Sequence, residues 1–350
     1  MTRHPRRFDR YQSGQTAVCE LGWRMDQTAA APARPARRAT RTTAAPSANP
    51  LILQPLPAWV RHGRDEGGAA LAAGAALLGL DQILRVAPPW LGTLRLRQAL
   101  VAAAATGRLL RLREDLAAFR DAHHLTRPTD DPGPAGHLHR AWRGLASQPT
   151  RLDLGSLARL GSLMAPAVAP EHLLLTVGDH DAGDPVVAAA TTAARLRIAM
   201  PGPDGVLLGL MVADLVLAAR LGWANPVPLL ATALAQPALR ARLDHSRASV
   251  SDPDWIAACQ AGYAAALAET YARAVDLARR ADALTSAMRV VRTKGANHGL
   301  TALLADDVVA ASHLAGLGSE RAARRFLDRL ATLGVVREQT GRATFRLYGL

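Results

Sequence analysis

Helix-length runs of alanine and leucine, almost free of aromatic residues, make up most of this chain from Leu56 onward. Hydrophobic residues account for 49% of its 350 residues, but aromatic residues for only 4%. Its core must therefore consist of Ala, Leu and Val. Such a core suits closely packed helices better than sheets, since Ala and Leu are strong helix formers and depleted aromatics disfavour strands. The sequence predicts a mainly α fold, with an Ala/Leu-rich, multi-helix, bundle-like domain.

The spacing of apolar residues predicts where these helices lie. The expected ranges are Glu66–Val86, Leu91 to Leu125 with a bend near Gly107, Ala135–Leu145, Leu154–Met164, Glu171–Thr176, Pro185–Met200, Gly205–Leu221, Leu229–Leu234 and Pro253–Arg292. Val206–Leu221 is the best transmembrane candidate, but Asp214 and Arg220 interrupt it. It is also shorter than the roughly 20 residues that a span needs. We therefore expect a buried helix there, and no membrane partner.

The C-terminal stretch Ser319–Leu350 combines a helix with a small hairpin. Ser319 is a good N-cap, apolar residues follow it at helical spacing, and Gly334 is a typical C-terminal stop. Two β-prone runs, Val335–Glu338 and Thr344–Tyr348, come next and are joined by a turn. A helix that runs into a hairpin is typical of a winged helix, so we expect a small winged-helix-like α+β module.

A winged helix also needs a helix before the one that enters the DNA. The best candidate is Val308–Leu314, with Ala315–Gly318 as the turn, although this segment begins with two β-branched residues. The domains predicted are therefore a disordered basic tail over 1–50, a helical domain over 51–292 and the module over 293–350. Within the tail, an alternative interpretation is that 1–24 are an upstream extension and that the protein starts at Met25.

Arginines of the module form a candidate DNA-binding site. Arg321, Arg324 and Arg325 share the polar side of the predicted helix, and Arg342 and Arg346 lie on the hairpin. Such a helix can enter a major groove while the hairpin lies near the phosphates. The alternative is a solvated face in an arginine-rich protein, since the whole chain contains a single lysine, Lys294.

The net charge of +13 is concentrated at the two ends of the chain. Residues 1–50 carry nine Arg and three acidic residues, and 319–350 carry seven Arg and three acidic residues. The long middle segment is close to neutral. A basic surface that could bind an acidic partner, such as a nucleic acid, is therefore expected only in the tail and in the module.

Metal and catalytic motifs are weak in this sequence. The densest set of potential metal ligands is Asp179, His180, Asp181 and Asp184, but it has no established spacing, and Asp is also a common loop and capping residue. His123 and His124 are adjacent, and His137 and His139 are two apart, so neither pair presents both rings on one helix face. We expect no cofactor and no catalytic constellation.

The two cysteines, Cys19 and Cys259, are far apart and form no metal or redox motif. No apolar run in Met1–Arg24 suggests a secretory signal. A reduced, cytoplasmic compartment is the simplest expectation.

Three places in the chain resemble an uncharacterised bacterial family defined as a domain of unknown function. They are Arg127–Gly136, Gly222-Trp223 with Pro226–Leu230, and Arg321–Leu350, and the resemblance covers about Leu51–Leu350. The ending is also similar to the winged helix attached to some Fic-type and plasmid-borne bacterial proteins. The Fic catalytic motif is absent here, so that activity is not implied.

The leading hypothesis is a non-enzymatic DNA-associated or regulatory protein that uses its C-terminal module on double-stranded DNA. The alternative is a helical scaffold whose wing packs on its own domain or on a second copy of the chain. An enzyme that uses the loop 178–185 is the least favoured.

Overall fold

A computed structural model describes residues 52–62, 66–127, 129–163, 167–178, 183–243, 252–291, 293–342 and 344–350. The predicted tail, with its alternative start at Met25, lies outside these residues. Asn49–Leu350 form one compact unit. The boundary predicted at 292/293 falls between the last helix of the helical body and the first helix of the C-terminal module.

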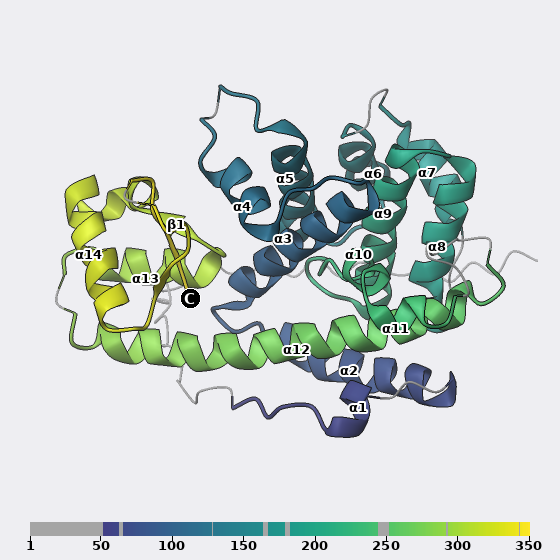
Figure 1. Ribbon diagram of the computed structural model, residues 1–350, viewed down its shortest axis with the longest axis horizontal. Coiled ribbons are helices and arrows are strands. Elements are labelled where there is room, and N and C mark those ends of the chain that lie inside the picture. Colours follow the sequence, from purple (N-terminus) through teal and green to yellow (C-terminus); the bar gives the residue numbers. More distant parts are fainter. Residues whose placement is uncertain are drawn as a thin grey trace, which may run out of the picture. The chain divides into compact units, whose positions relative to one another are not determined.

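The described residues are mainly helical, as predicted, with one small antiparallel sheet near the C-terminus (Figure 1). The helices are α1 Ala58–His62, α2 Glu66–Val86, α3 Leu91–Leu109, α4 Leu116–His124, α5 Gly133–Ser147, α6 Leu154–Gly161, α7 Pro170–Val177, α8 Pro185–Ala199, α9 Pro203–Leu221, α10 Leu230–Leu234, α11 Pro237–Arg240, α12 Trp255–Met288, α13 Ala296–Ala305 and α14 Glu320–Thr332.

The helix α9 is buried without interruption from Leu207 to Ala218 and packs against α8. A helix that is apolar on all sides is stable only inside the protein. The prediction that Val206–Leu221 forms a buried helix is therefore confirmed. Asp214 is fully buried on this helix, and its two carboxylate oxygens each accept a backbone N–H, from Leu229 and Leu230, at 3.0 Å. These bonds satisfy donors at the start of α10 that have no partner within that helix.

The helix α12 extends over 34 residues and contacts helices from all parts of the fold, from α1 and α2 to α13. It packs against α2 on one side and against α8, α10 and α11 on the other (Figure 1). Gly262 allows the closest part of this packing, because a Cβ there would overlap the carbonyl oxygen of Ala233. Small residues thus let the long helix approach its neighbours closely.

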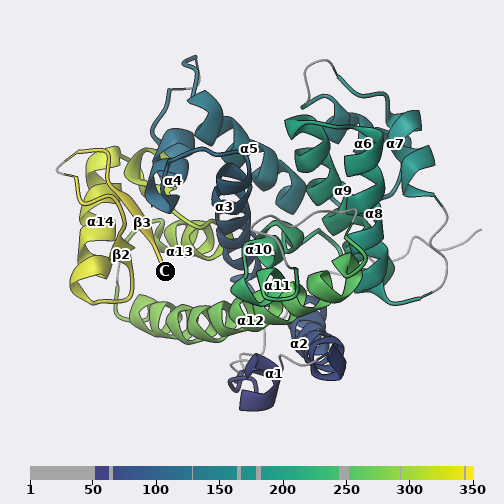
Figure 2. The ribbon, with the colours of Figure 1, turned by 45° about the vertical axis from the view of Figure 1, so that its right-hand side comes forward.

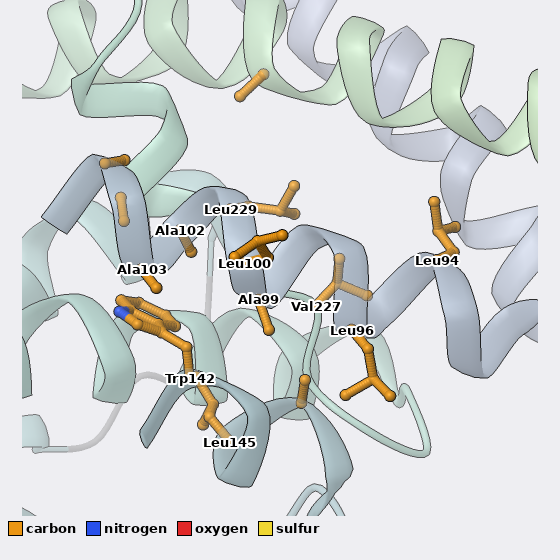
Figure 3. Packing of buried hydrophobic residues seen from close by; sticks show 14 of the residues in the cluster. Leu94, Leu96, Ala99, Leu100, Ala102, Ala103, Trp142, Leu145, Val227 and Leu229 are labelled. Carbon is orange, nitrogen blue, oxygen red and sulfur yellow. The ribbon is translucent and has the colours of Figure 1, made fainter. Parts of the chain in front are cut away.

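Trp142 on α5 anchors the packing of α5 on α3. Its ring is fully buried and lies beside Ala103 of α3, and Leu145 lies one turn further along α5 (Figure 3). The indole N–H donates a hydrogen bond to the Thr106 hydroxyl at 3.1 Å. The alanine-rich stretch of α3 leaves room for this large ring, so Trp142 fills the space where the two helices meet.

The prediction of one long helix from Leu91 to Leu125 is wrong, because this part of the chain forms two helices, α3 and α4. Arg111 adopts a positive φ of 66° between them, and Asp115 caps α4 by accepting the N–H of Ala118 at 2.8 Å. Gly107 lies against the ring of Phe119, so the two helices contact each other closely. Amphipathic spacing is similar in both helices and does not reveal the break.

The C-terminal module contains α13, β1 Val309–Ala310, two short 3₁₀ turns, α14, β2 Arg337–Glu338 and β3 Leu347–Gly349. The turns are η1 Ala311–His313 and η2 Ala315–Leu317. The strands pair antiparallel in the order β1–β3–β2, and Tyr348 on β3 lies opposite both Val309 and Glu338. The prediction of a helix over Val308–Leu314 is therefore wrong, because the β-branched start of this segment forms the strand β1 instead.

The module and the helical body share one apolar core. The same cluster contains Leu94 and Trp142 of the body and Phe326, Leu330 and Tyr348 of the module. Figures 1 and 2 show α13, α14 and the strands gathered at one end of α12. The module is thus packed onto the body through buried apolar side chains.

One described helix, within Gly68–Val86, is long and apolar enough to cross a membrane, with 39% of that window buried inside the fold. Single helices of this length and composition also occur in the cores of proteins that span no membrane. The absence of a membrane partner stays a prediction from the sequence.

Asp214 should give the protein a distinct pH dependence of stability. Burial raises the pKa of Asp214 to about 8, although the N–H groups of Leu230 and Leu229 lower it. The folded state therefore keeps a proton that an unfolded Asp, with a pKa of about 4, has already released. The free energy of unfolding should fall by about 1.4 kcal/mol per pH unit from this group as the pH rises from about 5 to 8.

Urea unfolding of the wild type and of Asp214→Asn at several pH values measures this effect. The asparagine stays neutral at every pH, and its single carbonyl oxygen can still accept one of the two N–H groups. The difference in unfolding free energy between the two proteins should therefore change with pH. Parallel curves would show that Asp214 is ionised in the folded state.

Candidate functional site

The polar side of α14 carries the arginines predicted to contact DNA. Ser319 caps this helix by accepting the N–H of Ala322 at 3.2 Å, and Gly334 follows it with a φ of 71°. The apolar side is buried, as expected, through Ala323, Phe326, Leu327 and Leu330. The structure therefore leaves the opposite side of α14 in solvent.

Arg321, Arg324 and Arg325 are all exposed on this side. Arg324 pairs with Glu320 one turn earlier on the same helix. Within the part of the chain that the structure describes, neither Arg321 nor Arg325 forms an ion pair with a carboxylate. Among the described residues, none of the three is thus held by an acidic residue of the helical body.

The two hairpin arginines are placed differently, because both have acidic partners. Arg342 donates to Asp121 on α4 at 3.0 Å, and so links the hairpin to the helical body. Arg346 lies 3.7 Å from Asp328 on α14 and donates its Nε–H to the carbonyl of Arg342 at 3.1 Å. The side chains of Arg342 and Arg346 remain 54% and 47% exposed, so these ion pairs are open to solvent.

Of the four candidate metal ligands in the loop 178–185, the structure describes only Asp184. Asp179, His180 and Asp181 lie outside the described residues. Asp184 caps α8, since its carboxylate accepts the N–H of Val186 at 2.7 Å. This capping bond accounts for an Asp before a Pro-initiated helix without any metal.

A second candidate site, not predicted from the sequence, lies where α4 and α5 meet the start of the module. Three histidine rings cluster there: His123 and His124 from the end of α4, and His139 from α5. The ring centroids are 4.7 Å apart for His123 and His124, 5.0 Å for His123 and His139, and 5.9 Å for His124 and His139. The spacing of residues along one helix cannot reveal this cluster, because the packing of α5 on α4 brings the ring of His139 beside those of His123 and His124.

Asp306 and Asp307, which follow α13 directly, complete this cluster. Arg143 of α5 binds both carboxylates: one Nη lies 2.8 and 3.0 Å from the two oxygens of Asp306, and the other donates to Asp307. His124 Nε2 lies 3.6 Å from Asp307 Oδ1. The Arg143 and Asp307 side chains are only 14% and 2% exposed, so this is a buried ion pair between the body and the module.

Several polar atoms of the cluster have no hydrogen-bond partner among the described residues. They are His123 Nδ1, His124 Nε2, His139 Nε2 and Asp307 Oδ2. Buried polar atoms are nearly always paired in native proteins. The concentration of four such atoms in one place therefore marks a candidate binding site for an ion or a small ligand.

The electrostatics of the cluster favour neutral imidazoles beside a charged carboxylate. Burial lowers the pKa of His123 to about 3 and that of His139 to about 4; the charge of Arg143 lowers both further, whereas the charge of Asp307 opposes the shift. Burial alone would raise the pKa of Asp307, but the neighbouring His124 and the charge of Arg143 hold it well below its usual range. At neutral pH both histidines thus keep a free nitrogen lone pair.

The chain belongs to the family described as protein of unknown function DUF1403, whose model matches residues 47–350. This match confirms the resemblance to an uncharacterised domain family over nearly the same range. None of the curated proteins compared with the chain matches it.

The buried pairing of Arg143 should contribute far more to stability than an exposed pair of the same type. In Arg143→Met, two carboxylates lose a buried guanidinium, and we expect the free energy of unfolding to fall by about 3 kcal/mol or more. Arg342→Met is the matched control, since it removes an exposed pair that also joins body and module. Its cost should be about 0–1 kcal/mol.

Chemical denaturation of the two variants at one pH measures this difference. Equal losses in the two variants would contradict the inference that the buried ion pair of Arg143 stabilises the protein more than the exposed pair of Arg342.

Proposed function

We propose that this protein binds double-stranded DNA through α14, with the β2–β3 hairpin beside it, and has a regulatory rather than an enzymatic role. The observation that carries the proposal is the set of three exposed arginines on one side of α14, Arg321, Arg324 and Arg325. A helix that presents guanidinium groups in this way can place them against phosphates and base edges in a major groove.

The order of elements supports this proposal. The sequence α13, β1, two helical turns, α14, β2, β3 and the strand order β1–β3–β2 follow the arrangement of a winged helix. In that arrangement α14 is the recognition helix, and the hairpin is the wing. The turns η1 and η2 then take the place of the middle helix.

The existing ion pairs do not oppose DNA binding. Arg324 and Glu320 are 66% and 52% exposed, and an exposed ion pair stabilises a protein by about 0–1 kcal/mol. A phosphate can therefore replace the carboxylate as the partner of Arg324. Arg346 and Arg342 are likewise half-exposed on the hairpin, where a wing would approach the backbone of the duplex.

Salt-titrated binding of a mixed-sequence DNA duplex tests the proposal. We expect wild-type affinity to fall steeply with salt. Arg321/Arg325→Ala should weaken binding and reduce the log–log salt slope by about 0.9 for each phosphate that the variant no longer neutralises. Arg61/Arg151→Ala is the matched control, because it removes two exposed arginines of the helical body and changes the net charge equally. Absence of binding by the wild type, or equal weakening in both double variants, would reject the proposal.

A helical scaffold that associates with itself is the second candidate. Its specific support is the outer side of α2, where Leu71, Leu78 and Val86 are 64%, 62% and 59% exposed. A row of exposed large apolar residues is common at protein–protein contacts. Sedimentation of the wild type and of Leu71/Leu78→Gln distinguishes this candidate, which requires a dimer that the variant loses.

A further inference from the structure

The cluster of histidines and aspartates offers a set of metal-ligand atoms at one point, where the Asp307 side chain is 2% and the Asp306 side chain 36% exposed. A nitrogen of His124 and one oxygen each from Asp306 and Asp307 lie within 4.8 Å of one another. They come from the end of α4 and from the link between α13 and β1. The fold, and not a sequence motif, brings them together.

Two of these ligands have an atom free to bind a cation. His124 Nε2 and Asp307 Oδ2 are buried and have no hydrogen-bond partner among the described residues. The side chains of His124 and Asp307 are only 6% and 2% exposed. Both atoms thus lack solvent as an alternative partner, and both can act as electron-pair donors.

His139 has the hydrogen bonding typical of a metal-bound histidine. It is fully buried, and its Nδ1 lies 3.1 Å from the carbonyl oxygen of Phe119. A carbonyl can only accept a hydrogen bond, so Nδ1 carries the proton and Nε2 carries the lone pair. Metal ligands are commonly fixed in this way by a backbone carbonyl behind the ring. His139 Nε2 has no partner among the described residues, and its ring centroid is 5.9 Å from that of His124.

Arg143 is the obvious alternative to a metal ion as the cation that binds the two aspartates, but it does not bind all of their carboxylate oxygens. Its Nη atoms take both oxygens of Asp306 and only Oδ1 of Asp307, so Asp307 Oδ2 finds no partner in the described part of the chain. An arginine that binds carboxylates from behind acts as an outer partner and orients them.

We propose that His124, Asp306 and Asp307 bind a divalent transition-metal ion, for which Zn²⁺ is the best match, and that His139 supplies a fourth ligand. Imidazole nitrogen with carboxylate oxygen, and no thiolate, is a ligand set that Zn²⁺ accepts in four-coordinate sites. Histidine disfavours Ca²⁺ and Mg²⁺, which take oxygen ligands. Four-coordinate zinc with Zn–N bonds of about 2.0–2.1 Å places neighbouring imidazole centroids roughly 5 Å apart. The centroids of His124 and His139 are 5.9 Å apart, so the two rings would move slightly closer to share one ion.

Such an ion would connect three segments of the fold. It would join α4 and α5 of the helical body to the start of the sheet in the C-terminal module. Metal binding should therefore stabilise the folded chain and hold the module on the body. The site does not depend on DNA binding, so either proposal can fail alone.

Equilibrium dialysis of the full chain against ZnCl₂, followed by metal analysis, tests the site. We expect about one Zn²⁺ per wild-type chain and a raised melting temperature with the ion. Co²⁺ should give the visible absorption of a tetrahedral site with nitrogen and oxygen ligands. His124→Ala and Asp307→Asn should each weaken binding at least about tenfold.

Two matched histidine variants identify the ligands. His137→Ala removes an exposed imidazole from α5, and His180→Ala removes the histidine of the loop 178–185; both should bind Zn²⁺ like the wild type. Circular dichroism shows whether each variant is folded. If Asp307→Asn does not fold, His124→Ala alone tests the metal site. Absence of stoichiometric Zn²⁺ in the wild type, unchanged binding in a folded His124→Ala, or loss of binding in His180→Ala would each overturn the proposal.

Discussion

A buried guanidinium fixes the link between the helical body and the C-terminal module, beside the apolar core that the two share. Arg143 on α5 binds Asp306 and Asp307, the residues that connect α13 to the first strand. Removing such charges from water is costly, so a buried pair is tolerated only when its geometry and hydrogen bonds are well satisfied. The link to β1 is therefore held in one place, and the sheet and α14 follow from it.

This attachment also decides which surface of the module remains available. Phe326 and Leu330 of α14 join the common core, so the arginine side of the same helix must face solvent. At the other edge of the module, Arg342 reaches Asp121 of α4. Part of the positive charge predicted to lie free on the hairpin thus holds the hairpin against the body, whereas the charge of Arg321 and Arg325 does not.

The same attachment gathers the histidines. Asp307 enters the space beside the end of α4 because Arg143 holds it there, and its carboxylate then lies near His124. His139 is placed by the packing of α5 around Trp142 and by its bond to Phe119. A polar, buried centre thus arises at the junction of two parts of the chain that each have an ordinary helical sequence.

Much of the fold could be predicted from the sequence, because helical periodicity, caps and stop signals act over a few residues. Glu66–Val86, Gly205–Leu221 and the Ser319-capped helix were located well on this basis. The break between α3 and α4 and the strand at Val309 were missed, because long-range contacts decide between local structures of similar stability. The candidate cluster could not be predicted, since His124 and Asp307 are far apart in the sequence and only the packing of α13 against the body brings them together. The sequence by itself therefore determined a helical protein with an arginine-rich end, and the tertiary structure alone decided which arginines are free and where buried ligands meet.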